Sequence, residues 1–298
     1  MARFRKTASP EKQALSVAKS LHRGGHIQSV RTLSNYQERL AIVARNLSRF
    51  GIDGEIRGLR ETHIHTYLDH RRAEVGQKTL DMERQALQAM ARYVTNEIAP
   101  EKTFSVVKSD HEQHLTGRAY TPEQVTLVAE HQSAKHALAT EIAYAAGLRA
   151  SELHTLRPVE EKPADDRPAL ESKWTGREGV RYTVNGKGGL VREVLIPNAL
   201  AVRLEGMRLS TPVQITDRGV HVEKHYGIGG GQNWSNSFSG ASNRALGWSA
   251  GAHGVRHSYA QERMDELQRS GLTHALAKET VSQELGHFRA DITETYLR

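Results

Sequence analysis

The sequence predicts a mainly α-helical protein of two domains with one small β-hairpin. Apolar residues recur at intervals of three and four in both halves of the chain, which is the spacing of helices with one buried face. A single pair of alternating runs around an Asn-Gly turn gives the only clear β signal. At 298 residues, the chain has the length of about two ordinary domains.

The first domain is predicted to be a small helical domain at residues 31–100. The apolar residues between 33 and 50 alternate in steps of three and four, and Ser34 can form a capping box at the start of that helix. Further helices are predicted at 63–75 and 79–94, joined by short turns. No strand pattern occurs among them, so helices alone are expected to build this domain.

Two polar segments flank the predicted helical domain. Residues 1–30 are interpreted as a basic arm, because the stretch up to Arg31 holds seven Lys and Arg against the single acid Glu11, a local net charge of +6. A solvated tail without a binding role is the competing interpretation. Residues 101–118 follow Pro100, are mostly polar, and are predicted to form a linker.

The second domain is predicted at residues 119–298. Thr121 and Pro122 are typical of a helix start, and the strongly apolar stretch 136–147 predicts another helix. The runs GVRYTV and LVREVLIP flank NGKGG (185–189) and predict the hairpin. Residues 157–179 are predicted to be a surface insertion. Residues 227–252 are predicted to form a long loop and a short helix, followed by helices to the end.

Composition favours a polyanionic partner and excludes several chemistries. Lys and Arg outnumber Asp and Glu by 41 to 34, and the pI is about 9.6, which points to nucleic acid. The absence of cysteine excludes disulfides, thiolate zinc sites and cysteine nucleophiles. No signal peptide, membrane-spanning run or compact metal-ligand spacing is found, so a cytoplasmic protein without membrane association is expected.

Three short motifs in the second half carry residues that can do chemistry. They are GLRASEL (147–153), HGVRHSY (253–259) and LGHFRADITETY (285–296). Each motif alone can also be explained by a purely structural role. An Arg after a helix-ending Gly usually lies on the surface, a His and an Arg three apart often form a structural pair, and a Tyr in a last helix usually packs.

Together the motifs supply the groups needed for phosphodiester transfer without a metal. Two arginines can fork around the nonbridging phosphate oxygens and stabilise the charge that develops there. A lysine on a glycine-flanked turn can protonate the leaving sugar oxygen, and a histidine can take a proton or hold the phosphate. A tyrosine hydroxyl, with an ordinary pKa of about 10, needs such help to attack at neutral pH.

In this order and context, the motifs resemble those of the tyrosine recombinase (phage integrase) family of site-specific DNA recombinases. The resemblance runs from about residue 30 to the end of the chain. It implies a helical core-binding (SAM-like) domain and a catalytic domain that clamp the DNA duplex. It also implies catalytic roles for Arg149, Lys187, His253, Arg256, His287 and Tyr296, with Glu152 in support.

Residues 76–94 resemble the core-binding segment of that family. Lys78 and Arg84 lie on the helix whose family counterpart faces DNA, although a solvated helix face would carry the same residues. The predicted partner is double-stranded DNA with a specific recombination site. DNA affinity is expected to fall steeply with salt, because phosphate contacts release counterions.

The resemblance implies a reaction in which Tyr296 attacks a DNA phosphate. The products are a 3′-phosphotyrosyl link and a free 5′-hydroxyl, which then attacks the link on the partner strand. No cofactor is expected, since neither metal nor ATP is needed. Four protomers on two DNA sites would exchange strands through a Holliday junction, and the biological setting would be a mobile genetic element.

Three features depart from the family pattern. The stretch 160–179 is longer and more acidic than usual, and the loop at 227–240 is unusually rich in glycine. Only two residues follow Tyr296, so coupling between protomers is expected to use another surface. The alternatives are DNA relaxation like that of a type IB topoisomerase, or a DNA-binding relative without catalysis.

Overall fold

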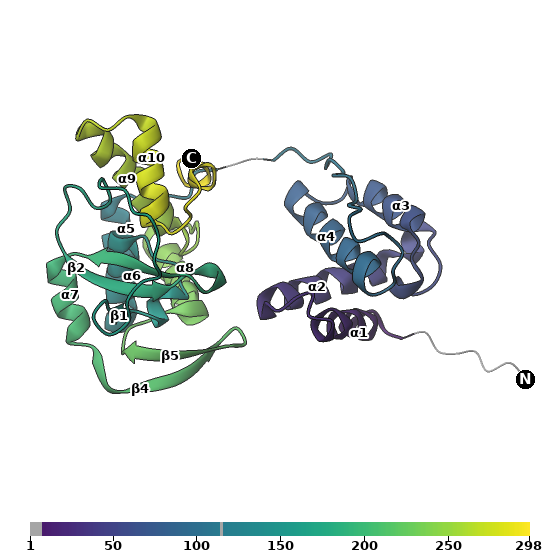
Figure 1. The fold of residues 1–298 in the computed structure, drawn as a ribbon, viewed down its shortest axis with the longest axis horizontal. Coiled ribbons are helices and arrows are strands. Elements are labelled where there is room, and N and C mark those ends of the chain that lie inside the picture. Colours follow the sequence, from purple (N-terminus) through teal and green to yellow (C-terminus); the bar gives the residue numbers. More distant parts are fainter. Residues whose placement is uncertain (1–7, 114–115) are drawn as a thin grey trace, which may run out of the picture. The chain divides into compact units, whose positions relative to one another are not determined.

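The computed structural model describes residues 8–113 and 116–298, and the chain divides into two compact units at about residue 114 (Figure 1). Each unit has a hydrophobic core of its own. Residues 1–7 of the predicted arm and residues 114–115 of the predicted linker lie outside the described residues. Among the described residues, no helix combines the length and apolar character that crossing a bilayer requires.

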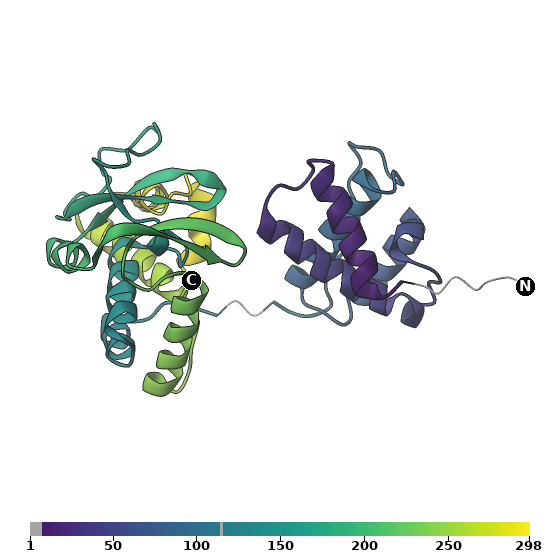
Figure 2. The same cartoon turned by 90° about the horizontal axis from the view of Figure 1, so that it is seen from below.

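The first unit is built from helices around one apolar core. They are α1 (Pro10–Arg23), α2 (Val30–Asn46), α3 (Glu61–Arg71) and α4 (Gln77–Tyr93), with short 3-10 turns at Ser48–Phe50 and Ile56–Gly58. Figures 1 and 2 show α1 lying against α2, and both helices also pack on α4. The first unit is therefore helical in all its regular structure within residues 8–113, as the periodicity predicted.

Part of the predicted arm belongs to this core. The buried residues Ala14, Val17 and Leu21 recur at intervals of three and four and place one face of α1 against the other helices. Burying that face favours a packed helix over a free basic segment. The helix α2 also begins earlier than predicted, at Val30, because Ser29 and not Ser34 caps it.

Residues 101–111, which the sequence assigned to the linker, also pack on the helical unit. Phe104 is buried, and its backbone N–H donates to Gln88 Oε1 at 2.9 Å. The Gln77 amide bridges the segment again, donating to the Val107 carbonyl at 3.0 Å and accepting from the Ser109 N–H at 2.9 Å. These side chains on α4 satisfy backbone groups that a free linker would leave to water.

The second unit combines helices with two small sheets. Its helices are α5 (Pro122–Glu130), α6 (Ala134–Ala146), α7 (Asn198–Glu205), α8 (Gly231–Leu246), α9 (Gly254–Arg269), α10 (His274–Glu284) and α11 (Ala290–Thr293), and a 3-10 turn, η5, covers Glu294–Tyr296. Thr121 and Gln124 form a capping box with Pro122 in the first turn, which confirms the predicted start of α5.

The three-stranded sheet has the antiparallel order β1 (Arg157–Pro158), β2 (Val180–Asn185), β3 (Val191–Ile196). The β2–β3 hairpin is the one that the sequence predicted, and Val184 pairs with Arg192 in its register. Figure 1 shows this sheet lying across α6, and Val184, Val194 and Ile196 join α6 in the core of the unit. The hairpin is thereby packed on α6.

Two elements differ from the sequence prediction. Residues 231–246 form one helix, α8, where a long loop followed by a short helix was predicted. Trp234, Phe238 and Ala241 make a buried face at helical spacing that outweighs the glycine and serine content. A second ribbon, β4 (Arg208–Asp217) with β5 (Val220–Tyr226), was not predicted. The alternation in Val213, Ile215, Val220 and Val222 is a short strand signal that the sequence prediction overlooked, although most residues of the two strands are exposed.

Candidate active site

The carboxylate of Glu152 forms the buried centre of the candidate site. Gly147 ends α6 in the left-handed conformation, with φ of 61°, and a side chain there would lie 2.7 Å from Tyr259. The chain then turns so that Arg149 Nη1 donates to Glu152 Oε1 at 2.8 Å, and the Arg149 backbone N–H donates to Oε2, also at 2.8 Å. The first predicted arginine and its supporting acid are therefore in contact.

Arg256 reaches the same carboxylate from α9. Its side chain is fully buried, and Nη1 lies 3.7 Å from Glu152 Oε2. The guanidinium donates to the backbone carbonyls of Gly147 and Leu285, and Nη2 lies 3.2 Å from His287 Nε2. Burial lowers the pKa of Arg256 to about 9, which still leaves it protonated at pH 7. The two predicted arginines thus flank one buried acid.

Tyr296 lies in the 3-10 turn η5, with its hydroxyl close to His253. Oη is 3.2 Å from His253 Nε2, and the tyrosine is only 8% exposed. Its ring centroid lies 5.0 Å from that of His287 and 5.6 Å from Arg256 Cζ. Gln261 on α9 holds the backbone beside it, donating to the Tyr296 carbonyl at 3.1 Å. The tyrosine therefore packs among the predicted histidines and the second arginine.

The histidines around Tyr296 are neutral at pH 7. Burial and the positive charge of Arg256 lower the pKa of His253 to about 3 and that of His287 to about 3. A neutral His253 can present the lone pair of Nε2 to the tyrosine hydroxyl. When His287 Nε2 accepts from Arg256, its Nδ1 carries the proton and faces Thr293 Oγ1 at 3.4 Å.

Glu152 is ionised in spite of its complete burial. Burial alone would raise its pKa, but the charges of Arg192, Arg256 and Arg149 together hold the pKa of this carboxyl well below its usual value. The carboxylate therefore balances only part of the positive charge around it. An anion such as a phosphate diester would complete that balance.

Lys187 lies on the turn of the β2–β3 hairpin, beside this cluster. The turn comes close to the acid, because the position of a Cβ on Gly186 would be 3.7 Å from Glu152 Oε1. The lysine side chain itself is exposed and forms no hydrogen bond or ion pair with the described residues. The structure thus brings the turn to the site but leaves the lysine in solvent.

Sequence reasoning missed two residues of this cluster, Arg192 and His257. Arg192 Nη2 donates to Glu152 Oε2 at 2.8 Å, and the His257 ring centroid lies 4.7 Å from that of Tyr296. Arg192 had a signal, because it shares the inward face of β3 with Val194 and Ile196, where an arginine is unexpected. His257 falls within HGVRHSY, one helical turn after His253.

Comparison with solved structures covers nearly the whole chain, whereas no family model and no curated protein matches it. XerH site-specific recombinase bound to its difH substrate matches with a TM-score of 0.56 at 15% identity, over 99% of this chain and 94% of that one. A lambda integrase tetramer bound to a Holliday junction gives 0.60 at 15% identity, over 98% and 78%. The Tn1549 transposon integrase in complex with transposon right end DNA gives 0.56 at 15% identity, over 96% and 94%.

The fold is that of the tyrosine recombinases. This confirms the predicted fold class, a mainly helical chain with small sheets that matches both the core-binding and the catalytic domains of these proteins. At this level of identity, the likeness extends to the fold alone. The roles of the individual residues therefore rest on the geometry described above.

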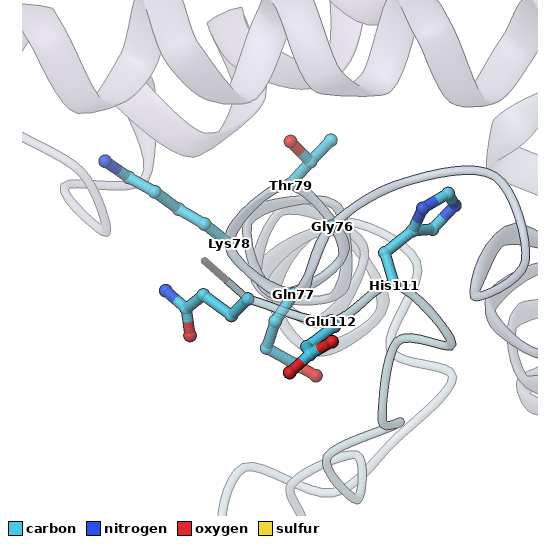
Figure 3. A pocket seen from close by; sticks show the side chains of 7 residues that line it. Gly76, Gln77, Lys78, Thr79, His111 and Glu112 are labelled. Carbon is cyan, nitrogen blue, oxygen red and sulfur yellow. The ribbon is translucent and has the colours of Figure 1, made fainter. Parts of the chain in front are cut away.

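Lys78 and Arg84, the two residues predicted to bind DNA, differ in how exposed their side chains are. Lys78 is exposed in the first turn of α4, at the edge of an open pocket, and Figure 3 shows its side chain extending away from His111. The Arg84 side chain is mostly buried, with Nη1 donating to the Phe104 carbonyl at 3.0 Å. Lys78 is thus exposed, whereas Arg84 is held by a backbone carbonyl.

Proposed function

We propose that the protein is a site-specific DNA recombinase that cuts and rejoins DNA through a 3′-phosphotyrosyl intermediate. The observation that carries this proposal is the position of the Tyr296 hydroxyl, which lies 3.2 Å from a neutral His253 beside arginines held on one buried acid. A nucleophile, a proton acceptor and cations for phosphate are thereby gathered in one place. A packing role for Tyr296 would need none of these neighbours.

The cleavage step balances with groups that the chain supplies. The Tyr296 oxygen forms a bond to phosphorus while its proton passes to His253 Nε2. The bond between phosphorus and the 5′-oxygen of the next nucleotide breaks, and Lys187 supplies the proton that this oxygen takes up. The products are a 3′-phosphotyrosyl link and a free 5′-hydroxyl, so the energy of the phosphodiester is retained for rejoining.

The arginines supply the stabilisation of the transition state. Arg149 and Arg256 are anchored to Glu152 and to backbone carbonyls, so their guanidinium groups are oriented before the substrate arrives. Charge that grows on the nonbridging oxygens then meets cations that need no reorganisation. His287 lies between Arg256 and Thr293, and its ring can donate to the same phosphate once one of these two contacts is given up.

Rejoining reverses these roles with a 5′-hydroxyl from a second DNA strand. Double-stranded DNA with a specific site is the proposed partner, and a homotetramer on two such sites is the proposed assembly. The lambda integrase neighbour, a tetramer on a Holliday junction, supports that assembly. The Tn1549 neighbour, bound to a transposon end, supports a role in a mobile genetic element.

The decisive experiment traps the covalent intermediate. The probe is a set of nicked duplexes made from the DNA that flanks the gene. A nick beside the cleavage position lets the short fragment with the new 5′-hydroxyl diffuse away, which prevents rejoining. Wild-type protein is expected to give an adduct that survives SDS. Tyr296→Phe removes the nucleophilic oxygen and is expected to give no adduct, while Tyr36→Phe changes a half-buried tyrosine on α2, outside the candidate site, and should leave the yield unchanged.

Other outcomes would replace the proposal. Equal adduct yields for wild type and Tyr296→Phe would show that another residue attacks. Binding of the duplexes without any adduct would favour a DNA-binding protein without catalysis. Relaxation of supercoiled plasmid regardless of sequence, with no product joining two sites, would favour activity like that of a type IB topoisomerase.

A further inference from the structure

A third arginine, Arg192, is buried beside Glu152 in this cluster. It lies on β3 opposite Val184 and is 4% exposed. A buried arginine on the inward face of a strand is costly unless its charge is paired and its donors are bonded. Its contacts therefore indicate what it does there.

The guanidinium of Arg192 bridges two parts of the candidate site. Nη2 donates to Glu152 Oε2 at 2.8 Å, and Nη1 donates to the backbone carbonyl of Glu284 at 2.7 Å. Glu284 is the last residue of α10, where carbonyls lack helical partners and favour a cation. One side chain thus joins the buried acid to the helix end that leads into His287.

The glycine of the motif LGHFRADITETY, Gly286, leaves space for the Arg192 side chain. Gly286 has φ of 71°, and a side chain at this position would overlap Arg192 Cδ. The next residue is His287, whose Nε2 faces Arg256. The Arg192 side chain therefore packs against the backbone at Gly286, one residue before His287.

Arg192 also decides how the charge of Glu152 is shared. It occupies Oε2 at 2.8 Å, whereas Arg256 Nη1 stays at 3.7 Å from the same oxygen, beyond hydrogen-bond distance. The Nε atoms of Arg256 and Arg192 both lack a hydrogen-bond partner in the part of the chain that the structure describes, so the two arginines differ only in their terminal nitrogens. Arg256 is therefore paired with the acid by charge but not by a direct hydrogen bond, so its guanidinium donors are not used up by Glu152.

We propose that Arg192 is a positioning residue of this active site. It orients Glu152 toward Arg149, holds the end of α10 that carries His287, and keeps Arg256 available for the scissile phosphate. The proposal rests on the recombinase function proposed above. Because β3 begins at Val191, directly after the hairpin turn, Arg192 also anchors the strand that carries the Lys187 turn to the rest of the site.

The test compares Arg192→Lys and Arg192→Gln with the wild type in single-turnover cleavage of saturating nicked duplex. Lysine keeps the charge but cannot make the two-pronged bridge. Both variants are expected to form the SDS-resistant adduct roughly 10- to 100-fold more slowly, the scale of a small misalignment of reacting groups. The Kd for DNA, measured with the same duplex, should stay within about 3-fold of the wild-type value, because the side chain is buried.

Two further variants separate positioning from a general structural or electrostatic effect. Arg181→Gln removes an exposed arginine from the neighbouring strand β2 and should cleave at the wild-type rate. Glu152→Gln removes the group through which Arg192 is argued to act. In that background, Arg192→Gln should slow cleavage by less than about 3-fold, since residues that work through one another are not additive.

The results that would overturn the proposal are distinct from failure of the proposed function. No adduct with wild-type protein would remove the recombinase function itself. With an active wild type, unchanged rates in both Arg192 variants would exclude the positioning role. A full additional loss in the Glu152→Gln background would overturn the claim that Arg192 acts through Glu152. An Arg192→Lys protein that no longer folds, judged by tryptophan fluorescence, would make Arg192 a purely structural residue.

Discussion

Replacing Glu152 by glutamine is expected to destabilise the second unit more than almost any other single change to a polar side chain. The carboxylate is completely buried and accepts from Arg149 and Arg192 at 2.8 Å, with Arg256 at 3.7 Å. Glutamine has nearly the same shape but no charge. Its amide group would also turn donors toward guanidinium groups that are donors themselves.

The size of the effect follows from the buried charges that remain. Removing one partner of a buried ion pair typically costs about 3–5 kcal/mol, because the other charge stays buried and uncompensated. Here the acid is shared by three arginines, so the upper half of that range is expected. For a unit of this size, each kcal/mol lowers the Tm by roughly 2–4 °C, so a cost of about 4–5 kcal/mol gives a fall of roughly 8–20 °C.

Tryptophan fluorescence is a suitable assay, because Trp174, Trp234 and Trp248 are the only tryptophans of the chain and all belong to the second unit. Urea unfolding followed in this way reports on that unit without contribution from the helical one. Glu294→Gln is the matched control, since Glu294 makes only an exposed ion pair with Lys278 and should change little.

The pH dependence gives the same prediction a second test. Because the folded-state pKa of Glu152 lies well below its usual value of 4.5, its stabilisation is complete above pH 4.5 and is lost as the pH falls further toward the folded pKa. The difference between wild type and variant should therefore be full at pH 7 and smaller at pH 4. A variant as stable as the wild type at pH 7, or a difference that grows toward pH 4, would refute the reasoning.

Three further predictions concern the turn lysine, the motif glycine and the histidines. Lys187→Ala should slow cleavage of ordinary DNA but not of DNA with a 5′-bridging sulfur, whose leaving group needs no proton; equal slowing on both would move the acid role elsewhere. An alanine held in the left-handed conformation costs roughly 1–3 kcal/mol. Gly286→Ala should destabilise the second unit by more than this, because its side chain would also overlap Arg192. Gly176→Ala, with φ of 79° and open space around it, should cost only that amount. Equal losses in urea unfolding would mean that the arginine on β3 does not occupy the space at Gly286. Burial lowers the pKa of both His253 and His287 to about 3, so below the usual histidine pKa of 6.5 the unfolded chain binds more protons than the folded one. The Tm should therefore fall between pH 7 and pH 5. A Tm that rises over this interval would contradict this prediction.

Several features of the fold could be predicted from local sequence alone. The start of α5 at Thr121 and Pro122, the end of α6 at Gly147 and the β2–β3 hairpin each depend on a few neighbouring residues, and all three are present. Local rules also placed a helix in the region of α4, with boundaries that shift by one or two residues.

Other features depended on packing that no short stretch reveals. Residues 10–23 carry the charge of an arm, but Ala14, Val17 and Leu21 gain more by burial against α2 and α4. The helix α8 contains glycine, serine and asparagine, which favour loops, yet Trp234 and Phe238 anchor it in the core. In both cases tertiary contacts outweighed local preference.

The candidate site shows the same division. The sequence by itself determined which residue types the motifs contain and that each motif lies in a short, well-defined stretch; their catalytic roles stay a prediction. Only the tertiary structure decided that Glu152, Arg256 and Tyr296 meet, since they lie on elements far apart along the chain. It also added Arg192, because the cost of burying a charge is met only where partners from other elements converge.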